Sequence, residues 1–252
     1  MNIQLENKVA IVTGASTGIG RAIALALAES GAKVVVNYCS NENAALEVAS
    51  AIQAKGQAAL AIPADVTEKQ ELDAMVQQVL ANFGSRIDIL VNNAGSMIQR
   101  CPIMDLDEET IDKVFAVNVK GVIFCTQAIL PYMEPGGRII NISSIAARTG
   151  GAGGSVHYAA AKGAVNTLTW GMALELRPQG ILVNAVAPGL IKTPFHEKFT
   201  RPEHFEKMKK HIPIGREGKP EEIAAAVVFL ASDYASYLMG EVIEVNGGWW
   251  MG

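Results

Sequence analysis

Apolar, β-rich runs alternate with segments of helical period along the whole chain, and this alternation constrains the fold more than any other feature. We predict seven strands, over residues 8–12, 33–37, 58–62, 87–91, 138–143, 181–186 and 241–245. Helices are predicted between them, over residues 18–29, 41–54, 68–82, 109–132, 156–176 and 220–231. Strands that are apolar on both faces and alternate with helices indicate a parallel sheet covered by helices on both sides. No linker or internal repeat interrupts the pattern, so it predicts one doubly wound α/β domain over residues 1–252.

One segment departs from this alternation. Residues 190–212 mix charged side chains with scattered aromatic ones and show no regular period. We expect this segment to form a helical flap over a site. Its lysines at 207, 209 and 210 stand near Glu203 and Glu206, which favours a solvated helix face over a docking patch.

Composition and charge exclude several classes of function. The chain is 50% hydrophobic and carries a formal net charge of -4, which gives no overall reason to bind nucleic acid or an anionic membrane. The N-terminal MNIQLENK lacks an apolar signal core, and no apolar run approaches the roughly 18 residues of a membrane span. Cys39, Cys101 and Cys125 lie far apart without a C-x-x-C pair, so we expect small buried hydrophobes rather than a disulfide or metal site. These features predict a cytoplasmic protein with a small-molecule partner.

A glycine-rich turn follows the first predicted strand. In TGASTGIGRAIALALAESG, Gly14, Gly18 and Gly20 precede an amphipathic helix. Glycines let the backbone approach a pyrophosphate, and the helix N-terminus supplies free N–H groups. The spacing is G-x-x-x-G-x-G rather than G-x-G-x-x-G, so a plain βα connection remains the alternative at this point.

Two polar residues stand out in the alanine-rich stretch HYAAAKGAV. Tyr158 and Lys162 are four residues apart in a segment that favours a helix, so they share one face. Taken alone, the pair is most simply a tyrosine at the rim of a buried helix with a lysine that extends past it. His157 points elsewhere on the helix, and we expect no catalytic role for it.

An ordered set of motifs gives this pair a different meaning. Six motifs follow one another along the chain: TGASTGIG, NNAG at 92–95, Asn118 in VNVKG, Ser144 in NISS, Tyr158 with Lys162, and PG at 188–189. Together they resemble the short-chain dehydrogenase/reductase family over essentially the full length. The resemblance implies a single-domain Rossmann-type sheet and an NAD(P)-dependent oxidoreductase. Ser144 and Tyr158 are fourteen positions apart, one more than in many relatives, and the glycine-rich RTGGAGG between them can absorb the extra residue.

The resemblance assigns the catalytic roles. It implies that Tyr158 is the acid/base, that Lys162 lowers the pKa of Tyr158 and holds the nicotinamide ribose, that Ser144 binds the substrate oxygen, and that Asn118 positions a water for a proton relay. Ser143 should face away from Ser144 on an alternating strand. The positions implied for cofactor binding are Gly14, Ser16, Thr17, Gly18, Ile19, Gly20, Asn37, Tyr38, Ser40, Asp65, Val66, Asn92, Ala94, Gly95, Tyr158, Lys162, Pro188, Gly189, Ile191 and Thr193.

Electrostatics gives an independent reason for a lysine beside a catalytic tyrosine. A phenol with a pKa near 10 is only about one part in a thousand ionised at pH 7. An ammonium at roughly 4 Å, at an effective dielectric of about 20, contributes on the order of 4 kcal/mol, or about three pKa units. We therefore expect Lys162 to lower the pKa of Tyr158 enough for it to work as a base, while hydride moves between the substrate carbon and nicotinamide.

The end of the second strand bears on cofactor choice. Folds of this type that bind NAD usually place Asp or Glu about twenty residues beyond the glycine turn, where the carboxylate repels a 2'-phosphate. This chain has Asn37, Tyr38, Cys39 and Ser40 there, and no carboxylate before Glu42. Asn37, Ser40 and Asn41 offer neutral hydrogen bonds worth about 1 kcal/mol each. We predict a modest preference for NADP(H), with NAD(H) still usable, and we expect an aspartate at Tyr38 to reverse the order.

Several substrate classes and one non-enzymatic role are alternative interpretations of this sequence. A 3-oxoacyl-[acyl-carrier-protein] reductase should present cations to its acidic partner, but this chain has MEPGG at 133–137 and Leu174 at the corresponding places. VHYAAAKG and KTPFHEKF look more like glucose 1-dehydrogenases and general alcohol or ketone oxidoreductases, so we favour a small alcohol/carbonyl pair. A cofactor-binding regulator without chemistry would be expected to lack one of the four catalytic residues, and this chain has them all.

The resemblance also implies a homotetramer. We expect the helices at 109–132 and 156–176 to pair across one interface, and the C-terminal NGGWWMG to lie at another. Trp249 and Trp250 are accordingly interpreted as interface residues and not as a substrate platform.

Overall fold

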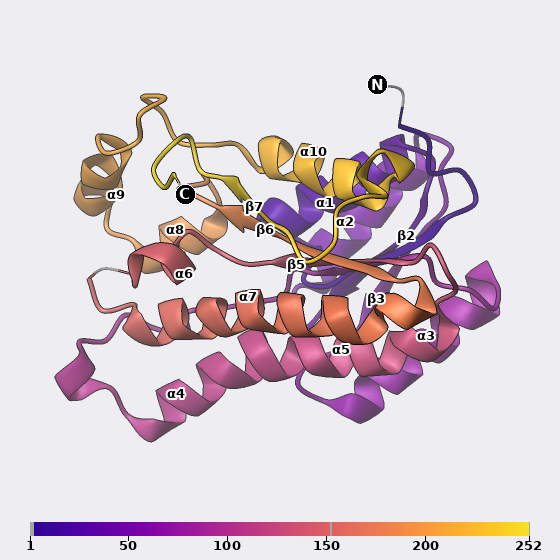
Figure 1. The fold of residues 1–252 in the computed structure, drawn as a ribbon, viewed down its shortest axis with the longest axis horizontal. Coiled ribbons are helices and arrows are strands. Elements are labelled where there is room, and N and C mark those ends of the chain that lie inside the picture. The colour runs from indigo at the N-terminus through magenta and orange to yellow at the C-terminus, as the bar shows by residue number, and fades with distance from the viewer. Residues whose placement is uncertain (1–2, 152, 252) are drawn as a thin grey trace.

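The computed structural model describes residues 3–151 and 153–251. Within them, seven strands form one sheet in the order β3-β2-β1-β4-β5-β6-β7, and every neighbouring pair is parallel (Figure 1). The strands are β1 (Val9–Val12), β2 (Lys33–Tyr38), β3 (Ala59–Pro63), β4 (Ile89–Asn92), β5 (Arg138–Ile142), β6 (Leu182–Pro188) and β7 (Val242–Val245). The predicted seven-stranded, doubly wound α/β fold is confirmed, and strand order reverses between β1 and β4.

Helices cover both faces of this sheet. In Figure 1, α1 (Gly18–Glu29), α2 (Glu42–Gln53) and α10 (Pro220–Ala231) lie above it, and α3 (Lys69–Phe83), α4 (Glu108–Phe115), α5 (Gly121–Ile129) and α7 (Val156–Leu176) lie below. The shorter elements are a π turn over Ala116–Lys120, α6 (Ala146–Thr149), α8 (Pro194–Phe199), α9 (Pro202–Lys209) and 3-10 turns over Ile103–Asp105, Leu130–Tyr132, Arg177–Gln179 and Asp233–Ala235.

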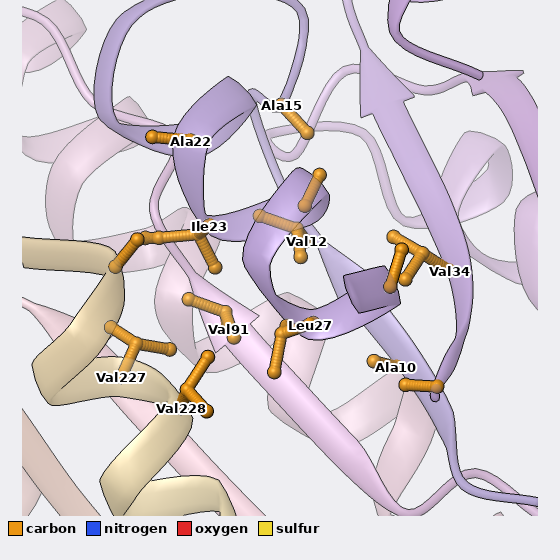
Figure 2. Packing of buried hydrophobic residues seen from close by; sticks show 14 of the residues in the cluster. Ala10, Val12, Ala15, Ala22, Ile23, Leu27, Val34, Val91, Val227 and Val228 are labelled. Atoms are coloured by element: carbon orange, nitrogen blue, oxygen red, sulfur yellow. The ribbon is translucent and has the colours of Figure 1, made fainter. Parts of the chain in front are cut away.

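The strands separate two cores because their side chains alternate. In β1, Val12 belongs to the core beneath α1 and α10, whereas Ile11 faces α3, α5 and α7. Figure 2 shows Ile23 and Leu27 of α1 between the strands and Val227 of α10. Ile11, Ile23 and Leu27 are fully buried, so each contributes about 1.5–3 kcal/mol to the free energy of unfolding.

The predicted helix 109–132 is continuous but not uniform. Residues Glu108–Tyr132 are 25 in number and, by length and composition, could cross a membrane, which corrects the expectation that no segment reaches that length. Its apolar side supplies Cys125 and Ile129 to the core under the sheet. The π turn in its middle contains Asn118, and π turns of this kind frequently mark functional sites.

Candidate active site

A cavity of about 1270 Å³ lies along the carboxyl edge of the sheet, where open α/β sheets bind ligands beside the reversal of strand order. Residues that follow β1, β2, β4, β5 and β6 line it. Of the predicted site residues, the structure places the following along the cavity: Gly14, Ser16, Thr17, Gly18, Ile19, Gly20, Asn37, Ser40, Asp65, Val66, Ala94, Gly95, Ser144, Tyr158, Lys162, Pro188, Gly189, Ile191 and Thr193. Three others, Tyr38, Asn92 and Asn118, do not line it.

The glycine turn is shaped for close approach of a phosphate. Gly14 and Gly18 adopt left-handed φ angles of 60° and 55°, and a Cβ at Gly20 would collide with the Gly14 carbonyl. Asn93 locks the turn, since its side-chain amide donates to the carbonyls of Thr13 (2.8 Å) and Gly14 (3.0 Å). Helix α1 begins here without a side-chain cap, so its first N–H groups are available to an anion.

The end of β2 differs from the prediction. The Asn37 amide donates to the carbonyls of Ile62 (3.4 Å) and Ala64 (3.0 Å), and its oxygen accepts from the Gly14 N–H (3.3 Å). Because both of its donor directions point to backbone carbonyls, Asn37 braces the glycine turn and is not placed to donate to a 2'-phosphate. Tyr38 is buried in the core beneath α1 and α2, and its side chain does not line the cavity.

Asn92 is also a structural residue. Its amide donates to Asn141 on the neighbouring strand (2.9 Å), and Asn141 donates to Thr169 of α7 (2.9 Å). This buried chain ties β4, β5 and α7 together. Ala94 and Gly95, which follow in the same motif, line the cavity.

Helix α7 and the end of β5 assemble the predicted catalytic group. The Ser144 hydroxyl lies close enough to the Tyr158 hydroxyl to lower the pKa of the phenol. Lys162 Nζ lies 5.8 Å from the centroid of the Tyr158 ring and donates to the Ile142 carbonyl (2.8 Å). Ser143 is buried and its hydroxyl donates to the Asn166 side chain of α7 (2.6 Å), so it is held by the helix.

The pKa values of this group differ from the expectation. Burial raises the pKa of the Tyr158 phenol to about 12, opposed in part by the nearby Ser144 hydroxyl. Burial also lowers the pKa of Lys162 to about 8. The expected lowering of the Tyr158 pKa by Lys162 is therefore absent from the protein itself, because desolvation penalises both charged forms. Tyr158 is a protonated hydroxyl at neutral pH, which is the form that donates a proton.

Asn118 lies one layer behind the cavity wall. Its amide donates to the carbonyls of Ser96 (2.6 Å) and Val114 (2.8 Å), while its buried oxygen has no hydrogen-bond partner among the described residues. A Cβ on Gly95 would lie 2.6 Å from that oxygen and 3.2 Å from Lys162 Nζ. The unsatisfied oxygen and the ammonium therefore approach the same glycine, an arrangement that suits a bridging water.

Asp65 and Thr193 occupy opposite parts of the cavity. Asp65 Oδ1 accepts from the N–H and the hydroxyl of Thr67, both at 2.8 Å, which fixes the carboxylate. The Thr193 hydroxyl donates to the Ile191 carbonyl (3.3 Å), and a Cβ on Gly18 would contact its side chain at 3.5 Å. Thr193 thus stands against the glycine turn.

The substrate end contains residues that the sequence did not assign. Phe195, His196, His204 and Met208 line it from the 190–212 segment. The Tyr158 and Phe195 rings pack with centroids 5.5 Å apart. The mixture of aromatic and charged residues in that segment was the available signal. Other unassigned residues of the wall include Arg100 and Trp249.

Arg100 holds the 190–212 segment against the rest of the wall. Its guanidinium donates to the carbonyls of Phe199 and Gly153 (3.0 Å for the latter) and to the Thr200 hydroxyl (3.3 Å). Burial, together with the nearby Arg100 charge, lowers the pKa of His196 to about 4, so this ring is neutral at physiological pH.

Cys39 also differs from the prediction. It is an exposed free thiol at the end of β2 and lines the cavity, whereas Cys101 and Cys125 are buried as expected. Among the described residues, no group of three His, Cys, Asp or Glu side chains is arranged to hold a metal ion.

Comparison with known proteins agrees with this geometry. A family model described as enoyl-(acyl carrier protein) reductase matches residues 14–250. The uncharacterized oxidoreductase YgfF of Escherichia coli K12 is 42% identical over 245 residues, which are 95% of this chain and 99% of the relative. The 3-oxoacyl-[acyl-carrier-protein] reductase FabG of Staphylococcus aureus Mu50 is 44% identical over 246 residues, which are 97% and 98% of the two chains.

A solved structure gives the same result. The short-chain dehydrogenase of Burkholderia cenocepacia J2315, crystallised in complex with NADP, superposes with a TM-score of 0.92 at 36% identity and covers 98% of this chain and 99% of that one. Fold, motif order and sequence similarity therefore agree over almost the whole chain. This chain belongs to the short-chain dehydrogenase/reductase family of oxidoreductases.

Proposed function

We propose that the protein reduces a small ketone or aldehyde with NADP(H), and that Tyr158 is the proton donor. The observation that carries the proposal is that Ser144, Tyr158 and Lys162 line one cavity together with the glycine turn, with Lys162 Nζ 5.8 Å from the centroid of the Tyr158 ring. Both hydroxyls are placed to bind one carbonyl oxygen. This arrangement is a general acid next to an oxyanion-binding group.

The residues that would hold the cofactor fit a dinucleotide. The glycine turn and the start of α1 would hold the pyrophosphate. Asp65 and Val66 would contact the adenine, and Thr193 would contact the carboxamide of the nicotinamide. A nicotinamide bound there supplies the hydride for carbonyl reduction. The orphaned oxygen of Asn118 lies 2.6 Å from where a Cβ on the cavity residue Gly95 would be, so it can accept from a water between the two.

Tyr158 and Lys162 transfer the proton that the reduction requires. Ser144 and Tyr158 orient the substrate oxygen, and Tyr158 donates its proton as negative charge develops there. Lys162 then restores the proton to Tyr158 from the cavity floor, where the Asn118 oxygen and the ammonium approach Gly95. A lysine whose pKa is about 8 exchanges protons readily near neutral pH.

We infer a modest preference for NADP(H) over NAD(H). Cys39 and Ser40 line the cavity after β2, and neither carries a negative charge to repel a 2'-phosphate at neutral pH. Asn41 accepts from the Ala44 N–H (3.3 Å) through its side-chain oxygen, so its amide group remains a potential donor along with the Ser40 hydroxyl. These are neutral donors, each worth about 1 kcal/mol, and they support a small difference in affinity.

A panel of carbonyl substrates tests the function. Small ketones, aldoses and acyl thioesters are each supplied with NADPH and with NADH, and cofactor oxidation is followed by absorbance. The proposal expects NADPH-dependent reduction of one or more small ketones or aldehydes. Turnover of the thioesters alone would support the second candidate instead.

The second candidate is reduction of 3-oxoacyl thioesters. The 44% identical relative bears that activity in its name, and Asp65 is the only carboxylate among the described lining residues. Lys113, Lys198 and Lys207 line the cavity, which suits the phosphate of a pantetheine arm. The exposed Leu174 is an argument against this second function, because a surface that binds an acidic carrier protein is expected to present a cation at this position.

We propose a homotetramer in which α4 and α7 form one interface. Ile111 and Phe115 on α4 and Trp170 and Leu174 on α7 are exposed in the single chain, with Leu174 68% exposed. The two helices lie side by side on one face of the molecule (Figure 1). Apolar side chains gathered on neighbouring helices are typical of obligate interfaces.

A further inference from the structure

One turn in the cavity wall has a backbone conformation that its residue disfavours. Ile98 has a φ of 64°, and the only other residue besides glycine with positive φ in the described chain is Asn7. A β-branched residue in this region is a genuine outlier, whereas asparagine tolerates it. Ile98 lines the cavity together with Ser96 and Met97. Strain of this kind persists only where the surroundings enforce it, and it clusters at functional sites.

Hydrogen bonds define the turn as a γ-turn. The N–H of Gln99 donates to the carbonyl of Met97 (2.7 Å), which closes a three-residue turn with Ile98 at its centre. The N–H of Ile98 donates to the Ser96 hydroxyl (3.0 Å). Both bonds are internal to the segment, so they shape the turn but do not attach it to the rest of the protein.

The Asn118 amide holds the Ser96 carbonyl (2.6 Å) and the Gln99 side chain donates to the Thr110 hydroxyl (2.8 Å), while His157 holds the centre of the turn. Its Nε2 lies 3.2 Å from the Met97 carbonyl and 3.0 Å from the Gln99 carbonyl, the two carbonyls that flank Ile98. Both partners are acceptors, so Nε2 carries the proton and donates to both. His157 is 3% exposed, and its Nδ1 has no hydrogen-bond partner among the described residues. Burying an imidazole with one nitrogen unpaired is costly, so the hydrogen bonds of the other nitrogen need an explanation.

The position of His157 links the turn to the chemistry. His157 directly precedes Tyr158 in the first turn of α7, so their side chains leave the helix in different directions. Tyr158 reaches the cavity and His157 reaches the back of its wall. The first turn of α7 therefore carries both Tyr158 and the side chain that contacts the two carbonyls flanking Ile98, and Tyr158 and Ile98 line the same cavity.

We propose that His157 is a positioning residue for substrate specificity, which holds Ile98 in its left-handed turn so that the Ile98 side chain forms part of the substrate wall. The proposal rests on the proposed carbonyl reductase function. Without the two hydrogen bonds from His157, the turn relaxes toward negative φ and the wall recedes. Small carbonyl substrates then lose a contact surface, whereas the nucleotide end of the cavity is unaffected.

Variants at position 157 separate this role from a merely structural one. His157→Leu keeps an apolar side chain in the buried space but has no donor, and His157→Gln keeps an amide donor at a similar reach. We expect His157→Leu to raise KM for the smallest ketone about tenfold, the range for losing a small apolar contact, with kcat and NADPH affinity changed less than about threefold. His157→Gln should restore most of the KM.

A double-mutant cycle with Ile98→Gly completes the test. Glycine adopts the turn without strain and has no side chain, so Ile98→Gly should show the same KM change, and His157→Leu should add little in that background. Equal KM values in wild type and His157→Leu, or full additivity with Ile98→Gly, would overturn the proposal.

A structural readout keeps the two proposals distinguishable. A crystal structure of folded His157→Leu should show Ile98 with a negative φ, and a retained positive φ contradicts the role of His157 whatever the activity. If His157→Leu does not fold, a crystal structure of His157→Gln decides, and it should keep both carbonyl contacts and the positive φ. If wild type reduces no carbonyl compound with either cofactor, the proposed function fails, while the conformation of Ile98 still decides the role of His157.

Discussion

The ammonium of Lys162 donates a hydrogen bond of 2.8 Å to the main-chain carbonyl of Ile142, the last residue of β5. The lysine is 4% exposed and has no carboxylate partner among its described contacts. Its charge is thus held in a poorly solvated place by a neutral dipole and by the face of Tyr158. Such a group is costly to the fold, which supports the proposed role of Lys162 in proton transfer.

Lys162→Met should stabilise the protein while removing its activity. Burial lowers the Lys162 pKa to about 8, so removing the ammonium gains about 3 kcal/mol at pH 7, and the unpaired Ile142 carbonyl offsets about 1 kcal/mol. We expect the free energy of unfolding to rise by ~2 kcal/mol in urea denaturation, with turnover close to background. A loss of stability would contradict the assignment of a desolvated cation.

The same group predicts a pH dependence of stability. The folded pKa of Lys162 lies below its unfolded value, so the unfolded chain binds more protons between pH 8 and about 10.5. The contribution of Lys162 to stability therefore rises with pH across this window and is least favourable below pH 8. The difference in unfolding free energy between Lys162→Met and wild type should shrink from pH 7 to pH 10. A constant difference would show that Lys162 titrates as in the unfolded chain.

Cofactor choice is predicted to respond to charge at Ser40. Ser40→Arg adds a guanidinium for a 2'-phosphate, and a charged hydrogen bond is worth about 1.5–3 kcal/mol. We expect the Kd for NADPH, measured by calorimetry, to fall about tenfold in Ser40→Arg and to rise about tenfold in Ser40→Asp. The Kd for NADH is the internal control and should change less than about threefold. Parallel changes for both cofactors would place the 2'-phosphate elsewhere.

Arg100 is expected to control access to the substrate end. Arg100→Lys keeps the charge but loses the fork that reaches both the Phe199 and Gly153 carbonyls. Hydrogen exchange at α8 and α9 should quicken, and KM for the carbonyl substrate should rise about tenfold while NADPH affinity is kept. Arg148→Lys is the matched control, because Arg148 pairs with Glu244 (2.8 Å) and does not line the cavity. Equal exchange in both variants would contradict this role.

The proposed tetramer predicts a selective effect at Leu174. Leu174→Arg places a cation in the exposed apolar surface of α7, so sedimentation velocity at micromolar concentration should show smaller species than the wild-type tetramer. Leu46→Arg is the control, because Leu46 is 48% exposed on α2, away from that surface. Wild type that sediments as a monomer would refute the assembly itself.

Most of the fold was predictable because its signals are local. Each predicted strand differs from the observed one by no more than two residues at either end, since runs such as VVV in β2 allow little else between helices. The π turn around Asn118 was not predictable, because a one-residue change of helical pitch leaves no mark in apolar periodicity.

The sequence predicted those cavity residues that belong to recognisable motifs. It did not predict residues that reach the cavity only through tertiary packing. Gly14, Ser144 and Tyr158 line the cavity as the motif order indicated. The burial of Tyr38 was not predictable, because its position in the motif does not reveal that its side chain turns into the core. Trp249 comes from the distant C-terminus, and the contact exists only after the chain has folded.

The central claim is that Tyr158 donates the proton, and Tyr158→Phe tests it most directly. The variant keeps the ring and its packing on Phe195 but has no hydroxyl to donate. Single-turnover reduction with saturating NADPH should slow by roughly two to four orders of magnitude, the range for loss of a general acid, while the Kd for NADPH stays within about twofold. Near-normal turnover in Tyr158→Phe, with the cofactor bound as in wild type, would contradict the account.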